Sequence, residues 1–310
     1  MTAASLALVE EHGTLAIFFS AMATSDVFFQ SIQLSEVTLR VRDLERTRAF
    51  YENLLGMQAV AVNPARVELA AGESVRAMIV LEHAPDAPQR PPKAAGLFHV
   101  AILYPSRSAL GRVAGDLVKK RVAFGTGDHG VSEAFYLDDP EGNGVELYAD
   151  RALKDWPAAA ADGQVTMYTE AVDLRSLLAD GSGESDVAMP SETRIGHIHL
   201  SVSNLAGAEA FYGDVLGFPI RQRTYPGALF FGRDGYHHHF GANVWRSREP
   251  AIAGAAGLAR FAVNFSDQAE WTKVLARAEA KGLAVTRSAD TARVNDYDGI
   301  GVELRTVAAG

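Results

Sequence analysis

The segment Leu34–Met57 reads LSEVTLRVRDLERTRAFYENLLGM, and the segment Ile195–Phe218 reads IGHIHLSVSNLAGAEAFYGDVLGF. At a constant offset of 161 residues, the matching pairs are Leu39/Leu200, Val41/Val202, Leu44/Leu205, Ala49/Ala210, Phe50/Phe211, Tyr51/Tyr212, Leu55/Leu216 and Gly56/Gly217. Each copy begins with the alternation of a β-strand and then changes to helical spacing. Both end at Leu-Gly, a signal for a helix C-terminus. Each copy therefore predicts a strand followed by a helix.

A second pair of segments repeats at the same offset. Gly96–Leu103 (GLFHVAIL) matches Gly257–Asn264 (GLARFAVN), and Asp139–Leu147 (DPEGNGVEL) resembles Asp296–Leu304 (DYDGIGVEL). Asp139–Leu147 and Asp296–Leu304 each read as a Gly-rich hairpin turn that leads into a strand. The chain therefore consists of four units, each a strand, a helix and several further strands, that start near residues 34, 96, 195 and 257.

The spacing of the units predicts how the chain is divided. We expect an N-terminal extension over 1–30, a first domain of units one and two over 31–150, a linker over 151–194, and a second domain over 195–310. The linker contains the polar stretch DGSGESD and is long for an unstructured connection, so part of it, near 172–179, is expected to be helical. The apolar stretch Gly13–Met22 is short and follows acidic residues, which disfavours a signal peptide or membrane span. Met22 is a candidate for the true start.

The composition restricts the classes of partner and chemistry. The formal charge is −9, and no run of Lys and Arg occurs, which argues against nucleic acid or an anionic membrane surface as the partner. There are no cysteines, so any metal must be held by His, Asp or Glu. The lack of cysteine is compatible with the cytosol, where we expect the protein. A homo-oligomer is compatible with the sequence but not specified by it.

The repeated unit resembles the βαβββ unit of the vicinal oxygen chelate superfamily, which includes glyoxalases, fosfomycin-resistance proteins and extradiol dioxygenases. The resemblance extends from Leu34 nearly to the C-terminus. It implies an α+β fold in which four βαβββ units form two paired, cupped, mixed β-sheets. In the superfamily, metal ligands come from the first strand of each paired unit and from the last strand of one.

Carried over to this chain, the ligand positions of the superfamily are Glu36, His99, His197, Arg260, Glu146 and Glu303. Pairing units one and two would give an acidic site with one imidazole. Pairing units three and four would place Arg260 in the site, and a guanidinium cannot ligate a metal. Pairing units two and three gives His99, His197 and Glu146, the two-histidine, one-carboxylate set that suits iron(II). We prefer this interleaved pairing, which leaves Glu36, Arg260 and Glu303 to satisfy one another without a metal.

Two neighbouring residues compete for the ligand positions. His199 is two residues after His197 and so lies on the same face of the strand. The superfamily pattern H-x-x-L-x-V selects His197. Glu141 competes with Glu146 for the carboxylate position, but we expect it to be solvated in the turn.

Three adjacent histidines end the third unit, in the segment Gly235–Trp245 (GYHHHFGANVW). In extradiol dioxygenases a histidine at this place lies beside the metal and transfers protons. The pattern H-x-x-A selects His239, with His238 as the rival because neighbouring strand residues face opposite ways. A solvated hairpin is the structural alternative.

A further segment resembles the extradiol enzymes. The segment His129–Tyr136 reads HGVSEAFY, and Tyr136 precedes Glu146 by ten residues. The resemblance implies that His129 and Tyr136 donate hydrogen bonds to the substrate oxygens. His129 is two residues closer to Tyr136 than the family spacing. An ordinary strand aromatic is the alternative for Tyr136.

Together these features imply a non-haem Fe²⁺ extradiol dioxygenase, similar to the two-domain catechol-2,3-dioxygenases. Such an enzyme inserts O₂ into a catechol-type substrate and gives a hydroxymuconic semialdehyde-type product, a step of aromatic hydrocarbon catabolism. Mn²⁺ accepts the same ligands. The alternatives are a glyoxalase-type isomerase or lyase, which would need a fourth protein ligand, and a non-catalytic small-molecule-binding protein. The sequence does not specify which aromatic diol is the substrate.

Overall fold

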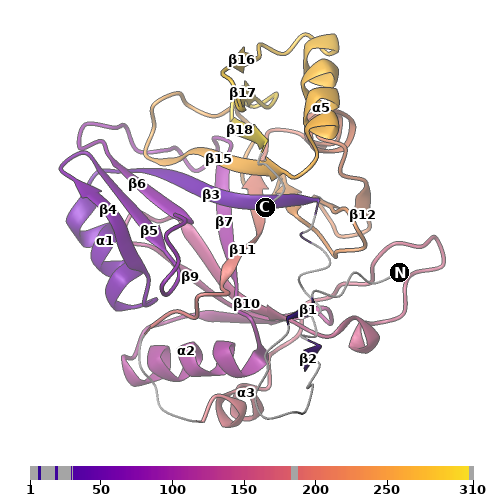
Figure 1. Cartoon of the computed structure of the whole chain (residues 1–310). Helices are drawn as coiled ribbons and strands as arrows, with labels where there is room; N and C mark the ends of the chain where they lie inside the picture. The colour runs from indigo at the N-terminus through magenta and orange to yellow at the C-terminus, as the bar shows by residue number, and fades with distance from the viewer. Residues whose placement is uncertain (1–5, 8–17, 20–28, 30, 183–187, 307–310) are drawn as a thin grey trace.

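Two eight-stranded mixed sheets form the body of the protein in this computed structural model, which describes residues 6–7, 18–19, 29, 31–182 and 188–306 (Figure 1). The first, sheet 2/3, has the order β12 (Ile220–Gln222), β13 (Ala228–Phe231), β14 (Phe240–Asn243), β11 (Arg194–Ser201), β7 (Gly96–Leu103), β10 (Gly144–Asp150), β9 (Ser132–Asp138) and β8 (Gly125–Asp128). The second, sheet 1/4, has the order β16 (Thr286–Arg287), β17 (Thr291–Asn295), β18 (Gly301–Thr306), β15 (Gly257–Phe265), β3 (Ile32–Val41), β6 (Ile79–His83), β5 (Arg66–Ala70) and β4 (Gln58–Asn63).

Each sheet joins strands from both halves of the chain. Sheet 2/3 is built around the antiparallel pair β11 and β7, and sheet 1/4 around the antiparallel pair β15 and β3. Parallel strands flank both central pairs, which are β14 and β10 in one sheet and β18 and β6 in the other. The α+β fold of four units and the interleaved pairing are thus confirmed. The division into domains 31–150 and 195–310 stays a prediction. Each of the two sheets contains strands from both of these ranges.

The helices begin where the sequence places their capping residues. They are α1 (Leu44–Asn53), α2 (Arg107–Lys119), α3 (Leu174–Asp180), α4 (Leu205–Ala208), continued by the π-helical η3 (Glu209–Val215), and α5 (Gln268–Ala280), with a short 3₁₀ turn η2 (Leu153–Asp155). The Asp43 side chain accepts a hydrogen bond from the N-terminus of α1, and Asn204 does so for α4. The predicted Leu-Gly ends are confirmed, since Gly56 and Gly217 have left-handed φ values of 72° and 80°. Helix α3 confirms the helix expected within the linker.

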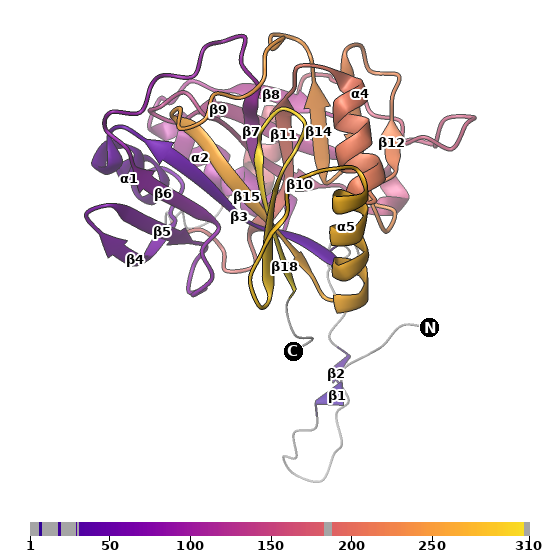
Figure 2. The ribbon, with the colours of Figure 1, turned by 90° about the horizontal axis from the view of Figure 1, so that it is seen from above.

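The larger of two hydrophobic clusters among the described residues extends over both sheets and their helices, and strand alternation decides which strand residues reach it. On β11, Ile198 and Leu200 belong to the core, while His197 and His199 alternate with them and face the other side. Strand β7 contributes Val100 to the core in the same way. The central strands of the two sheets contact each other, and α5 packs against η3 (Figure 2). Sheet 2/3 therefore has a second face that is available for a site.

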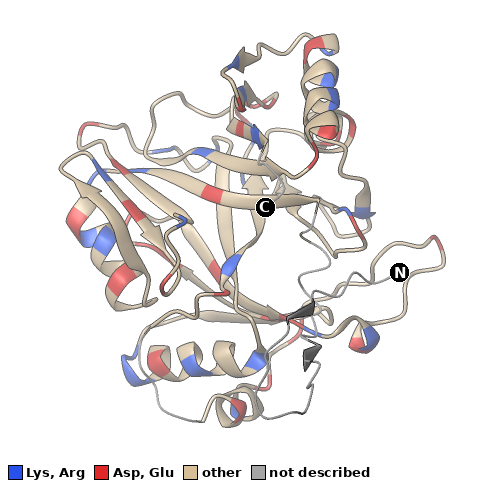
Figure 3. Ribbon diagram, in the orientation of Figure 1, with Lys and Arg blue, Asp and Glu red and all other residues tan. Residues whose placement is uncertain are grey.

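The surface carries charges of both signs. Lys and Arg are mixed with Asp and Glu along α1, α2 and α5 (Figure 3). No helix within the described ranges is both long enough and apolar enough to cross a membrane. The expectation that the chain binds neither nucleic acid nor a membrane stays a prediction.

Phe29, from the N-terminal region, belongs to the folded body. Phe29 is 1% exposed, and its ring packs against Tyr236 with a centroid distance of 4.9 Å. The folded part therefore begins before residue 31, because this aromatic ring covers the end of the site face of sheet 2/3. Two short strands, β1 (Leu6–Ala7) and β2 (Phe18–Phe19), pair with each other. The candidate start at Met22 lies outside the described residues.

Candidate metal centre

Three adjacent strands of sheet 2/3 bring the expected ligands together. Glu146 on β10 and His197 on β11 both pair with Ala101 of β7, so these residues form one row across the sheet. His99 is two residues before Ala101 on β7 and therefore lies on the same face. The strand order β11-β7-β10 thus converts three distant sequence positions into one cluster.

The ligand atoms of the cluster converge on one point. The Nε2 atoms of His99 and His197 lie 2.9 and 3.1 Å from Oε2 of Glu146, and the possible ligand atoms are all within 4.8 Å of one another. All three residues are at least nine-tenths buried. Both Nε2 atoms face the same carboxylate oxygen, so one cation could be bound by all three side chains. Among the described residues, only this cluster has three such side chains placed to hold a metal.

The electrostatics of the cluster prepare it for a cation. Burial alone would raise the pKa of the Glu146 carboxyl, but the neighbouring His197 and His99 hold it well below its usual range. Burial lowers the pKa of His197 to about 4, against the opposing effect of Glu146. At neutral pH the carboxylate is therefore ionised and His197 is neutral. These are the protonation states that metal binding requires.

The metal-free protein should lose stability as the pH falls from about 6.5 to about 4. The pKa of His197 is 6.5 when unperturbed and about 4 in the folded chain. The unfolded chain therefore binds more protons in this interval, so acid favours unfolding, by up to about 3 kcal/mol. The depressed pKa of Glu146 acts in the same direction at lower pH. Urea unfolding of chelator-treated protein at pH 7 and pH 5 measures the effect, and His197→Gln should reduce it. An equal pH dependence in the two proteins would contradict the assignment.

His129 and Tyr136 lie together at one side of the cluster. Tyr136 on β9 pairs with Glu146 across the strands, and its hydroxyl is 2.6 Å from Nε2 of His129. Nδ1 of His129 lies 2.8 Å from the carbonyl oxygen of Tyr168, which can only accept a hydrogen bond. Burial, reinforced by the charge of Glu146, raises the pKa of Tyr136 well above its usual range, so its hydroxyl keeps its proton. The short His129 spacing therefore does not prevent contact with Tyr136.

The histidine triplet divides between two environments. His238 lines the cavity, and its ring centroid is 4.1 Å from that of His197. The ring of His239 instead packs against Phe29 and Phe218, at 5.5 and 5.3 Å. This corrects the preference for His239 as the residue beside the metal. The reason is that the His239 backbone N–H is bonded to the carbonyl of Phe231, which fixes the orientation of this residue outside a regular strand.

The two rival ligands have other surroundings. His199 lines the cavity next to His99, with ring centroids 5.0 Å apart, but it is not part of the converging cluster. The Glu141 side chain is 5% exposed and accepts hydrogen bonds from the backbone and guanidinium of Arg42 and from the backbone of Asp43. The expectation that Glu141 is solvated was therefore wrong, because this carboxylate binds the start of α1.

A cavity of about 640 Å³ opens above the cluster. Part of its wall is aromatic, where Phe98, Phe230 and Trp245 surround the ring of His199 at centroid distances of 5.1, 5.6 and 5.4 Å. Arg246 lies on the lining as well. An apolar, partly enclosed space with a few polar groups at its base is typical of a small-molecule site. These aromatic residues could not be predicted from sequence spacing, because they lie on separate strands and loops.

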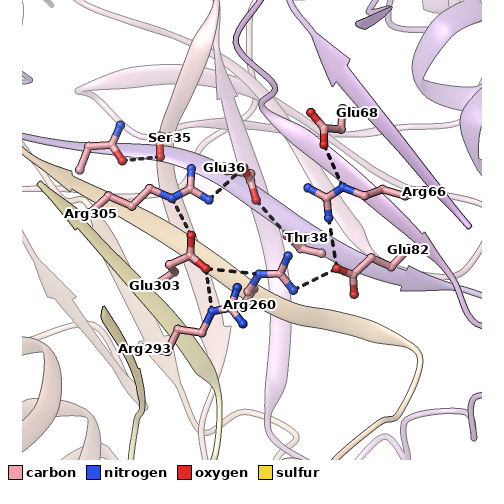
Figure 4. Close-up of polar contacts among 11 residues, drawn as sticks. Ser35, Glu36, Thr38, Arg66, Glu68, Glu82, Arg260, Arg293, Glu303 and Arg305 are labelled. Carbon is pink, nitrogen blue, oxygen red and sulfur yellow. Dashed lines mark hydrogen bonds and ion pairs between the residues drawn. The ribbon is translucent and has the colours of Figure 1, made fainter. Parts of the chain in front are cut away.

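Sheet 1/4 contains the equivalent row of residues, without histidine. Glu303 and Glu36 both pair with Ala262, and Arg260 is two residues before it on β15. Figure 4 shows that a charge network fills this place. Its bonds join Arg305 to Glu36 and Glu303, Arg293 to Glu303, Arg260 to Glu82, and Arg66 to Glu82 and Glu68. The expected ion pair between Arg260 and Glu303 is present at 3.8 Å. Glu36 is linked to Glu303 through Arg305, a residue that the sequence did not predict here.

The two repeat-equivalent carboxylates should differ in their effect on metal content. Glu146→Gln should lower the bound metal, because it removes the anionic ligand of the cluster. Glu303→Gln should leave metal content unchanged, because Glu303 is bonded to Arg293 and Arg305. Metal analysis of both purified variants tests this, with folding checked by circular dichroism. Loss of metal in Glu303→Gln would place the metal in sheet 1/4.

Two paired βαβββ units, with two imidazoles and a carboxylate on the cavity side of their sheet, define a metal-binding protein of the vicinal oxygen chelate type. The model of the Glyoxalase/Bleomycin resistance protein/Dioxygenase superfamily matches residues 33–147 and 194–304. The chain belongs to this superfamily.

Known proteins of this superfamily resemble the chain over most of its length. It is 41% identical over 263 residues to the catechol-2,3-dioxygenase of Bacillus subtilis (strain 168), which covers 83% of this chain and 91% of that protein. A Bacillus subtilis protein whose solved structure is provisionally described as a dioxygenase has a TM-score of 0.64 at 15% identity, covering 90% of this chain and 86% of its own. Glyoxalase I from Zea mays has a TM-score of 0.54 at 17% identity, covering 89% and 92%. The two structural likenesses support the fold.

Proposed function

We propose that this chain is an iron(II)-dependent extradiol dioxygenase that cleaves a catechol-type ring next to the diol and gives a hydroxymuconic semialdehyde-type product. The observation that carries the proposal is the cluster of His99, His197 and Glu146 at the base of an aromatic-walled cavity. The identity to a catechol-2,3-dioxygenase supports it. We place the reaction in the catabolism of aromatic compounds.

His99, His197 and Glu146 would hold the metal. Two neutral imidazoles and one carboxylate leave a divalent ion with a net positive charge and with positions open for other ligands. When bound, the metal supplies a site where a diol loses a proton readily and where O₂ is held next to the ring. The ligand set favours Fe²⁺ and also accepts Mn²⁺.

Residues of the chain supply the proton transfers and the orientation. His238 lies beside His197 on the cavity lining, and burial holds its pKa well below its usual range, so the free imidazole is neutral and can take a proton from a diol hydroxyl. The Tyr136 hydroxyl, held by His129, lies on the same lining and is placed to hydrogen-bond a substrate oxygen. The aromatic walls exclude water from the substrate ring. The cavity of about 640 Å³ leaves room for ring substituents.

A glyoxalase-type isomerase is the enzymatic alternative. That reaction would need a fourth protein ligand, and the converging cluster among the described residues has three members. The additional imidazoles beside the cluster are those of His199 and His238, and neither supplies a carboxylate. A binding protein without catalysis would have no use for the metal ligands. The observations therefore favour the dioxygenase.

Oxygen consumption is the direct test of the proposed function. Protein purified anaerobically should contain iron and should consume O₂ when catechol or a substituted catechol is added, with a yellow product. Reconstitution of metal-free protein with Fe²⁺ or Mn²⁺ distinguishes the two metals. The absence of O₂ uptake with every diol, in protein that has bound iron, would contradict the proposal. The cytoplasmic location and the homo-oligomer stay predictions, which fractionation and light scattering would test.

A further inference from the structure

A buried chain of hydrogen bonds extends behind the cavity from His238. Nδ1 of His238 lies 2.8 Å from Nδ1 of His237, and Nε2 of His237 lies 2.9 Å from Oδ1 of Asp150. The same carboxylate oxygen accepts the Tyr236 hydroxyl at 3.3 Å, and the Tyr148 hydroxyl is 2.7 Å from that of Tyr236. His237 is 0% exposed and His238 is 7% exposed. This series of hydrogen bonds therefore connects the cavity lining to the carboxylate of Asp150 behind it.

The carboxylate of Asp150 determines which nitrogen donates in each of these hydrogen bonds. A carboxylate can only accept, so Nε2 of His237 must donate its proton to Asp150. A neutral imidazole with one N–H has its second nitrogen as an acceptor, so Nδ1 of His237 accepts. The proton between the two rings therefore belongs to Nδ1 of His238. The remaining nitrogen of His238, Nε2, then carries a lone pair.

The site is built to hold this arrangement. Asp150 is four residues after Glu146 on β10, so both side chains lie on the same face of the strand. Tyr148 lies between them, and its ring is 4.8 Å from that of His197. A Cβ at position 196 would lie 1.7 Å from the Tyr148 hydroxyl, so glycine is required there. The strand register shifts at this point, between Ile195 and His197.

We propose that Asp150 and His237 are positioning residues that set the tautomer of His238, so that Nε2 presents its lone pair to the substrate. The proposal rests on the proposed function, in which His238 accepts the proton of a diol hydroxyl. On transfer, the O–H bond of the diol breaks and an N–H bond forms at Nε2. His238 then has a proton on both nitrogens and one positive charge. His237 and the carboxylate of Asp150 stabilise that charge, and return of the proton restores the neutral tautomer.

The tautomer can be measured directly in the unmodified chain. Long-range ¹H–¹⁵N correlation of ¹⁵N-histidine-labelled, Zn²⁺-substituted protein shows which ring nitrogen carries the proton, and the His238→Gln spectrum assigns the signals. We expect His238 to be protonated at Nδ1 and His237 at Nε2. The opposite tautomer of His238 would overturn the proposal. This measurement does not depend on turnover, and it uses the variant only to assign the signals.

Kinetics of Asp150→Asn tests the consequence for the reaction. An amide can rotate and donate to His237, which reverses the donors along the chain and protonates Nε2 of His238. We expect kcat to fall about 10- to 100-fold, the usual cost of losing an outer partner of a site. KM should stay within about twofold, because ground-state binding is unaffected. Metal content should be unchanged. A variant with wild-type kcat would refute the positioning role.

Tyr236→Phe is the matched control, because it removes the other donor to the same oxygen of Asp150 and leaves His237 in place. Its kcat should stay within about threefold of wild type, since the tautomer is unchanged. An equal fall in both variants would indicate general damage to the site and would also overturn the proposal. Failure of the proposed function can be distinguished from failure of this proposal. In that case the wild-type protein would show the predicted tautomer of His238 but would not consume O₂.

Discussion

Replacement of His197 by alanine is expected to remove the metal and the activity together. The variant keeps His99 and Glu146, but two ligands on adjacent strands do not complete the converging set. Loss of an outer partner already weakens metal binding about 10- to 100-fold, and loss of a direct ligand should exceed this. If the metal contributes about 4 kcal/mol to the transition state, ring cleavage falls at least about 1,000-fold. Metal analysis and oxygen uptake on the same preparation measure both effects.

The control for this variant is His83→Ala. His83 is an exposed histidine at the end of β6 in sheet 1/4, so its removal changes the histidine count without touching the cavity. This variant should retain both metal and oxygen uptake. Retention of full activity in His197→Ala would show that another residue, most directly His199, completes the site.

The second large effect is expected for His238→Gln. The residue lines the cavity beside His197, and general acid–base catalysis contributes about 100- to 10,000-fold to a rate. We expect kcat to fall within that range while the metal is retained, because His238 is outside the converging cluster. Steady-state oxygen uptake with metal analysis separates loss of turnover from loss of metal.

The neighbouring variant His239→Gln provides the contrast. Its ring is enclosed by Phe29, Phe218 and Tyr236, so we expect reduced stability against heat, with kcat per folded molecule close to wild type. Thermal unfolding measures the loss of stability. Dividing the rate of oxygen uptake by the amount of bound iron gives the turnover per folded molecule. A loss of turnover in His239→Gln with full activity in His238→Gln would restore the assignment made from the sequence pattern.

The repeats in the sequence predicted the four units, their interleaved pairing and the residues that converge at the cluster. This was possible because the units and their first-strand ligand positions recur at the same offset, so that Glu36 corresponds to His197 and His99 to Arg260. The superfamily resemblance supplied the role of these positions. The helix that ends at Gly56 was predictable for the same reason, because its Leu-Gly end requires a local backbone conformation.

Side-chain direction within the histidine triplet was not predictable. His237–His239 lie just before β14, where no regular strand fixes the alternation, and a bond from the His239 N–H to Phe231 determines which ring faces the cavity. The bond of His237 to Asp150 links positions far apart in the chain, and no sequence spacing reports it. The role of Arg305 in sheet 1/4 depends on the reach of a long side chain and was missed for the same reason.

The interleaved pairing has a consequence for the order in which a nascent chain can fold. Units two and three follow each other along the chain, so the strands of sheet 2/3 are all synthesised once Asn243 has emerged. Strand β3 is the first strand of sheet 1/4 to be made, but it pairs with β15, with Ile32 opposite Phe265, and must wait for the last unit. Until then its edge is open to pairing with other chains. Slow, non-local closure of sheet 1/4 should therefore limit the yield of soluble protein during synthesis.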